Sequence, residues 1–88
     1  MVRRDLLPLG VRVVRSAKRL TQEVVALENQ IDRSVVSNLE SGKLHKPELV
    51  FQIIDRAGGV EMLDRLIERL KELRSWFITQ QTNQLLYV

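Results

Sequence analysis

The sequence predicts an all-α protein that ends in one long helix. Apolar residues recur at spacings of three and four along most of its 88 residues, and no convincing strand-like alternation appears before the last few. Pro, Thr, Asp and Gly stand at the positions where helices are expected to begin or end. The apolar content of 44% is ordinary for a globular protein and argues against wholesale disorder.

Two helices are expected in the first third of the chain. Pro8 suits the first turn of a helix, where a missing N–H has no cost. The apolar stripe predicted for this helix consists of Leu9, Val13, Ala17 and Leu20. Thr21 is then placed to cap a short second helix that runs to about Glu28, with Glu23 in its electropositive first turn.

Two further helices follow a polar break at Asn29-Gln30. Asp32 is a good N-cap for a helix from Arg33 to about Ser41, and Gly42 is the residue that commonly ends one. A fourth helix opens at Pro47 and ends at Gly58-Gly59. Its inward positions are expected to be Val50, Ile53, Ile54 and Ala57.

The last predicted helix covers residues 60 to about 78 and has a coiled-coil spacing. Its apolar residues are separated by three and four in alternation, so we expect a core or dimer contact there. The residues assigned to dimerisation are Leu63, Leu66, Leu70, Leu73, Trp76 and Phe77. The tail that follows is polar until Leu85-Leu86-Tyr87-Val88, for which fraying, packing back and a short edge strand all remain open.

The second and third helices match a helix-turn-helix layout, two short helices joined by a tight turn. The positions that such a motif buries are all apolar here: Val25, Ala26, Ile31, Val36 and Leu39. Leu20-Thr21-Gln22-Glu23, then Ala26, then the run from Ile31 to Lys43 resembles the Cro and phage-repressor family of DNA-binding domains, also called the Xre family. The likeness extends over about residues 8–59.

The resemblance implies a five-helix, lambda-repressor-like fold whose third helix enters the DNA major groove, with the helix-turn-helix DNA-binding domain over residues 8–59. An N-terminal arm (1–7) would precede it, and a dimerisation segment (60–88) would follow. The resemblance assigns base contacts to Arg33, Ser34, Ser37 and Asn38, and phosphate contacts to Gln22, Lys43 and either His45 or Lys46. It also implies a structural salt bridge between Arg15 and Glu40.

The turn departs from the family pattern, because Asn29 and Gln30 replace an apolar residue and a glycine. We expect Asn29 to adopt the positive φ of the turn and Leu27 to supply the missing apolar contact. Asp32 places a carboxylate near the groove, where capping of the helix and acceptance from a cytosine are both open roles.

Composition narrows the function classes. The chain has no cysteine, one histidine and no phosphate-binding glycine loop, so we expect no enzyme, no cofactor and no metal site. No apolar run is long enough to span a membrane, and the absence of cysteine suits a reducing cytoplasm, where the protein would lie on the nucleoid. The first 20 residues carry six Arg or Lys against one Asp, which fits either a polyanionic partner or a solvated helix face.

The function predicted from these features is sequence-specific binding of double-stranded DNA by a homodimeric transcriptional regulator, most simply a repressor at a palindromic operator. Two alternatives remain. One is an antitoxin, which would bind a toxin through the C-terminal segment while it represses its own operon. The other is a pure interaction module that keeps the motif only as a scaffold.

Overall fold

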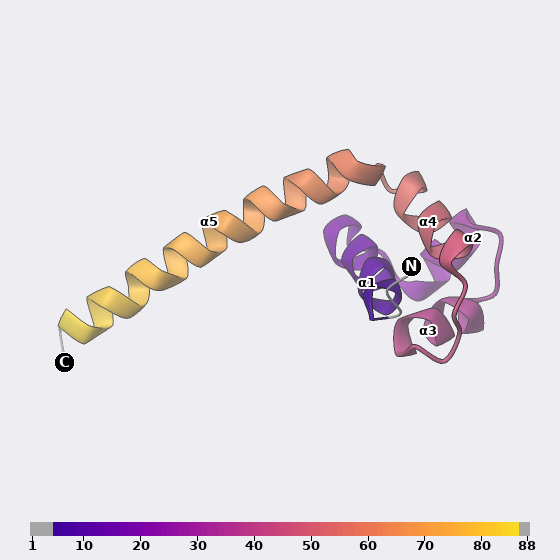
Figure 1. Cartoon of the computed structure of the whole chain (residues 1–88), viewed down its shortest axis with the longest axis horizontal. Coiled ribbons are helices and arrows are strands. Elements are labelled where there is room, and N and C mark those ends of the chain that lie inside the picture. Colours follow the sequence, from indigo (N-terminus) through magenta and orange to yellow (C-terminus); the bar gives the residue numbers. More distant parts are fainter. Residues whose placement is uncertain (1–4, 87–88) are drawn as a thin grey trace.

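The computed structural model describes residues 5–86, which form five α-helices and no strand, as an all-α fold requires. The helices are α1 (Leu6–Lys18), α2 (Gln22–Glu28), α3 (Arg33–Ser41), α4 (Pro47–Arg56) and α5 (Gly59–Leu86). Helices α1 to α4 cluster into a head, and α5 projects from it with the C-terminal end at its far tip (Figure 1). The prediction of an all-α fold with a long C-terminal helix is confirmed.

One apolar core holds the head together. Helix α1 packs against both α3 and α4, α2 packs against α3, and the start of α5 packs against α4. The core residues are Leu7, Val11, Val14, Val25, Ala26, Val36, Leu39, Val50, Ile53 and Met62. Four of the five inward positions predicted for the second and third helices are therefore buried, and Ile31 packs against the same core.

The predicted apolar stripe of α1 is half right, since Val13 and Leu20 pack against the core but the other two residues do not. Leu7, Val11 and Val14 are buried, whereas Leu9 is 51% exposed and Ala17 is also exposed. Helix α1 is apolar on two overlapping faces, and the requirement to contact α3 and α4 together selects between them. Because Leu7 belongs to the core, the arm predicted over residues 1–7 is too long, and its first four residues lie outside the described part of the chain.

The turn between α2 and α3 also differs from the prediction. Gln30 adopts the positive φ of 56°, and Asn29 has a φ of −104°. The Asn29 side chain is buried instead, where its Nδ2 donates to the Val25 carbonyl at 2.9 Å and its Oδ1 accepts from Gln52 Nε2 at 3.2 Å. The apolar residue of the family pattern is thus replaced by a hydrogen-bonded amide. Leu27 is 79% exposed and supplies no compensating contact.

Helix α5 is longer than predicted. It continues to Leu86, eight residues past Ile78, and so includes Leu85 and Leu86, for which fraying, packing back and an edge strand had been open. The hydroxyls of Thr79 and Thr82 donate to carbonyls one turn earlier, at Ser75 and Ile78, and so leave the helix uninterrupted. Tyr87 and Val88 lie outside the described residues.

Helix α5 gives the molecule its elongated shape. Its 28 residues correspond to roughly 42 Å at 1.5 Å per residue, against principal extents of 52 × 28 × 24 Å for the molecule. Along residues 5–86, no helix has both the length and the apolar content needed to cross a bilayer.

Candidate nucleic-acid interface

Helix α3 has a buried face and a polar outer face. Val36, Leu39 and Glu40 point into the head. The outer face carries the four predicted base-contacting residues, of which Ser37 is partly buried and the others, Arg33, Ser34 and Asn38, are exposed. A shallow surface depression of about 400 Å³ lies over the first turns of the helix, lined by Asp32, Arg33, Ser34 and Ser37.

The ion pair that the resemblance implied is present and ties α3 to α1. Arg15 Nη1 donates to both carboxylate oxygens of Glu40, at 2.7 and 2.8 Å, and Arg15 Nε donates to the Leu20 carbonyl at 3.2 Å. The Glu40 side chain is only 11% exposed and that of Arg15 31% exposed, so the pair is largely withdrawn from solvent. It fixes the inner face of α3 and thereby the direction of the outer one.

Gln22 is part of this network. Its Nε2 donates to Glu40 Oε2 at 3.3 Å, and the residue is partly buried at the first position of α2. The side chain predicted to hold a phosphate is therefore bonded to Glu40 in this structure. The predicted contact from its backbone N–H stays a prediction.

The N-terminal caps of the two helices differ. Thr21 caps α2 as predicted, since its hydroxyl accepts from the Val24 amide at 3.2 Å. Asp32 stands at the N-cap position of α3, but its side chain makes no capping hydrogen bond. The capping role predicted for Asp32 is therefore absent here, and acceptance from a cytosine stays a prediction.

Sequence reasoning missed Glu23 as a partner of the outer face of α3. Its Oε1 lies 3.0 Å from Arg33 Nε, and both side chains are more than 60% exposed. The pKa of the Glu23 carboxyl is lowered, first by a hydrogen bond from its own backbone amide and further by the Arg33 guanidinium, while desolvation opposes these effects. The two residues are ten positions apart, so only the packing of α2 on α3 brings them together.

The basic residues predicted to contact phosphates lie between α3 and α4. Lys43, His45 and Lys46 are exposed, and Leu44 between them packs against the core. The Leu44 amide also donates to the Asn38 carbonyl at 3.1 Å, which fastens this segment to the end of α3. Lys43 and Lys46 therefore flank α3 on a short, anchored connection.

The predicted dimerisation residues all lie on α5. Leu63 and Leu66 are partly buried near the head, whereas Leu70, Leu73, Trp76 and Phe77 are between 52% and 58% exposed. Nothing else in residues 5–86 covers this part of the helix, because every residue from Ile67 to Gln84 is exposed.

The outer face of α3 presents a guanidinium, two hydroxyls and a carboxamide, which are groups able to hydrogen-bond to base edges. No protein-family model, curated protein or solved structure matches this chain. The features that bear on function are therefore the outer face of α3 and the exposed apolar stripe of α5.

Proposed function

We propose that this protein binds double-stranded DNA through the outer face of α3 and acts as a homodimeric transcriptional regulator. The observation that carries the proposal is the division of α3 into two faces. Its inner face is locked to α1 and α2, while Arg33, Ser34 and Asn38 face solvent side by side. A rigid helix with such an outer face fits the width of a major groove.

The residues on this face have distinct expected roles. Arg33 suits a bidentate contact to guanine, and Asn38 suits the edge of an adenine. To reach a base, the Arg33 guanidinium would leave Glu23 and donate to guanine acceptors instead. The free-energy cost of breaking this ion pair is small because both side chains are exposed. Lys43 and Lys46 would contact phosphates and so set affinity rather than sequence preference.

Homodimerisation is the second part of the proposal. One α3 face contacts only a few base pairs, and a dimer with two-fold symmetry doubles the sequence that is read. The exposed apolar stripe on α5 supports an isologous contact, in which both subunits use the same surface.

The test begins with selection of bound DNA from a random pool, followed by affinity measurements on the selected site. We expect a palindromic sequence, and Arg33→Ala should weaken binding by about 5- to 150-fold, which corresponds to roughly 1–3 kcal/mol for a bidentate base contact. Lys43→Ala should weaken binding to all sequences alike and lower the slope of log affinity against log salt by about 1.

Lys71→Ala provides the matched control. Lys71 is an exposed basic residue on α5 that pairs with Glu68, so its loss changes the net charge equally without touching α3. Equal effects of Arg33→Ala and Lys71→Ala, or an affinity that does not depend on salt, would show that α3 does not bind DNA and would favour a pure interaction module.

The antitoxin alternative is favoured by one observation, the length of uncovered apolar helix in α5. A toxin bound there would leave DNA binding by α3 intact. The alternative predicts a monomer that becomes a stable heterocomplex when a protein encoded by a neighbouring gene is co-expressed.

A further inference from the structure

The outer part of α5 is an isolated helix in this structure. Every residue from Ile67 to Gln84 is exposed, and Leu70 and Trp76 remain 54% and 58% exposed. Helices in proteins gain most of their stability from tertiary packing of an apolar face rather than from helix propensity. The apolar stripe is therefore expected to be buried by another helix along its whole length. The charges beside the stripe restrict the orientation in which α5 of a second copy can pack against it.

A parallel pair of α5 helices would place like charges together. With Leu63, Leu70 and Phe77 at one seam position and Leu66 and Leu73 at the other, Arg69 and Arg74 flank the seam on opposite sides. In parallel helices such flanking residues meet across the interface when they are five apart. Arg69 would thus face the partner's Arg74 on both sides of the dimer.

An antiparallel pair avoids this clash and makes favourable contacts instead. Reversing one helix brings residues on the same flank together, so Arg69 faces the partner's Trp76 and Ile67 faces the partner's Arg74. A guanidinium over an indole ring is a favourable cation–π contact, and the arginine stem can cover an isoleucine. Both contacts occur twice because of the two-fold symmetry.

The register follows from the same residues. When Leu66 is opposite the partner's Phe77, Leu70 is opposite the partner's Leu73, and the exposed apolar stripe is covered from end to end. A shift of one heptad toward the head would leave Phe77 without an apolar partner and place Arg69 opposite the partner's Arg69. The stripe and its charges together therefore favour a single arrangement.

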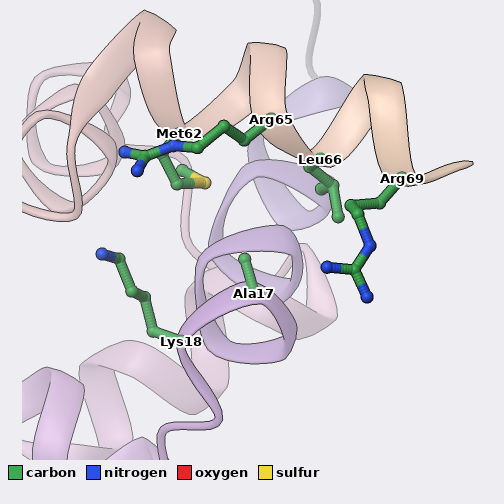
Figure 2. A pocket seen from close by; sticks show the side chains of 6 residues that line it. All are labelled: Ala17, Lys18, Met62, Arg65, Leu66 and Arg69. Atoms are coloured by element: carbon green, nitrogen blue, oxygen red, sulfur yellow. The ribbon is translucent and has the colours of Figure 1, made fainter.

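A cleft lies beside Arg69, at the position where the partner's Trp76 would pack. Between α1 and α5 lies a cleft of about 250 Å³ with an apolar floor of Ala17, Met62 and Leu66. Figure 2 shows Met62 and Leu66 reaching from α5 toward Ala17, with Lys18 and Arg65 on one side and Arg69 on the other. Arg69, which forms the edge of the cleft, is the residue that faces the partner's Trp76.

We propose that α5 pairs with α5 of a second copy in antiparallel orientation, with the partner's Trp76 against Arg69 at the mouth of this cleft. The inference rests on the homodimer of the proposed function and adds its direction and register. It places the two heads at opposite ends of the paired helices, each beside the C-terminal half of the other subunit's α5.

Distances between spin labels test the orientation. The chain has no cysteine, so Glu72→Cys and Thr82→Cys each give one labelling site, and both positions are exposed. In the antiparallel register, residue 72 lies almost opposite its own counterpart, whereas residue 82 is 21 residues along the helix from it. The label-to-label distance should therefore be short for Glu72→Cys and longer by roughly 30 Å along the helix axis for Thr82→Cys.

Sedimentation of the same labelled proteins separates the possible outcomes. A dimer with equal distances at both sites would be parallel and would overturn the inference, as would a dimer with a long distance at residue 72. A monomer at high micromolar concentration would overturn both the inference and the homodimer. DNA binding through α3 is measured independently by Arg33→Ala, so its failure can be told apart from failure of the pairing.

Discussion

Replacing Arg15 with methionine should destabilise the head strongly, because it leaves the Glu40 carboxylate without its guanidinium. Removing one partner of a buried ion pair costs about 3–5 kcal/mol. Arg15 is 31% exposed and Glu40 11%, so solvent screens the pair in part, and we expect a loss of roughly 2–3 kcal/mol. Gln22 Nε2, at 3.3 Å from Glu40 Oε2, remains as a weaker donor.

The assay is urea-induced unfolding followed by circular dichroism at one fixed protein concentration, since oligomerisation shifts apparent stability. Heating should show a midpoint lower by about 8–24 °C, at roughly 4–8 °C per kcal/mol for a domain of this size. A matched set consists of Arg15→Met, Glu40→Leu and the double variant. Because the double variant leaves no buried charge, it should be more stable than Arg15→Met alone.

The refuting result is additivity. If the double variant loses as much stability as the two single variants together, Arg15 and Glu40 are not energetically coupled. The pair would then be a surface contact, and the position of α3 would depend on apolar packing by Val36 and Leu39 alone.

Two further predictions concern the turn between α2 and α3 and the Glu23–Arg33 ion pair. Gln30→Gly should stabilise the protein by about 0.5–1 kcal/mol, because Gln30 has a φ of 56° that glycine adopts without strain, and Gln30→Ala, which keeps the Cβ, should bring no gain in the urea midpoint. Glu23→Gln should lower stability at neutral pH, and the difference from the wild type should disappear as acid protonates Glu23, since a carboxyl with a lowered pKa stabilises the folded state only while it is ionised. Urea midpoints compared across this pH range check the second prediction, and a difference that persists in strong acid would contradict it.

The features predicted correctly from the sequence depend on local chemistry. Thr21 caps α2, Gly42 ends α3 at a φ of 79°, and the inward residues of both helices follow from their spacing. Each of these depends on residues within one or two turns of each other. They form in the same way wherever the helix packs.

The errors arose where packing chooses between local options. Helix α1 has two apolar stripes, and contact with both α3 and α4 selects Leu7, Val11 and Val14. Asn29 is buried and its Oδ1 accepts from Gln52, 23 residues away on α4, while Gln30 makes the turn. No local signal at Asn29 carries that information.

The candidate site was predicted unevenly for the same reason. The outward residues of α3 follow from helix periodicity, and the Arg15–Glu40 pair followed from the family resemblance. Two contacts depend on how α2 packs against α3 and on the rotamers of the side chains between them: Arg33 with Glu23, and Gln22 with Glu40. Opposite charges on α2 and α3 were visible in the sequence, but their distance was not.

Two glycines with positive φ stand where the head joins α5: Gly58 in the link, with a φ of 120°, and Gly59 at the first position of α5, with a φ of 60°. A Cβ at Gly58 would stand 3.1 Å from the Met62 Cβ and would need a φ of 120°, so a side chain there would be strained and would shift the start of α5 by a few tenths of an ångström. The direction in which α5 leaves the head is therefore a property of the backbone at this joint. In a dimer paired through α5, that direction also fixes how far apart the two α3 helices lie. The spacing of operator half-sites would then be encoded at this joint, separately from the bases that α3 reads.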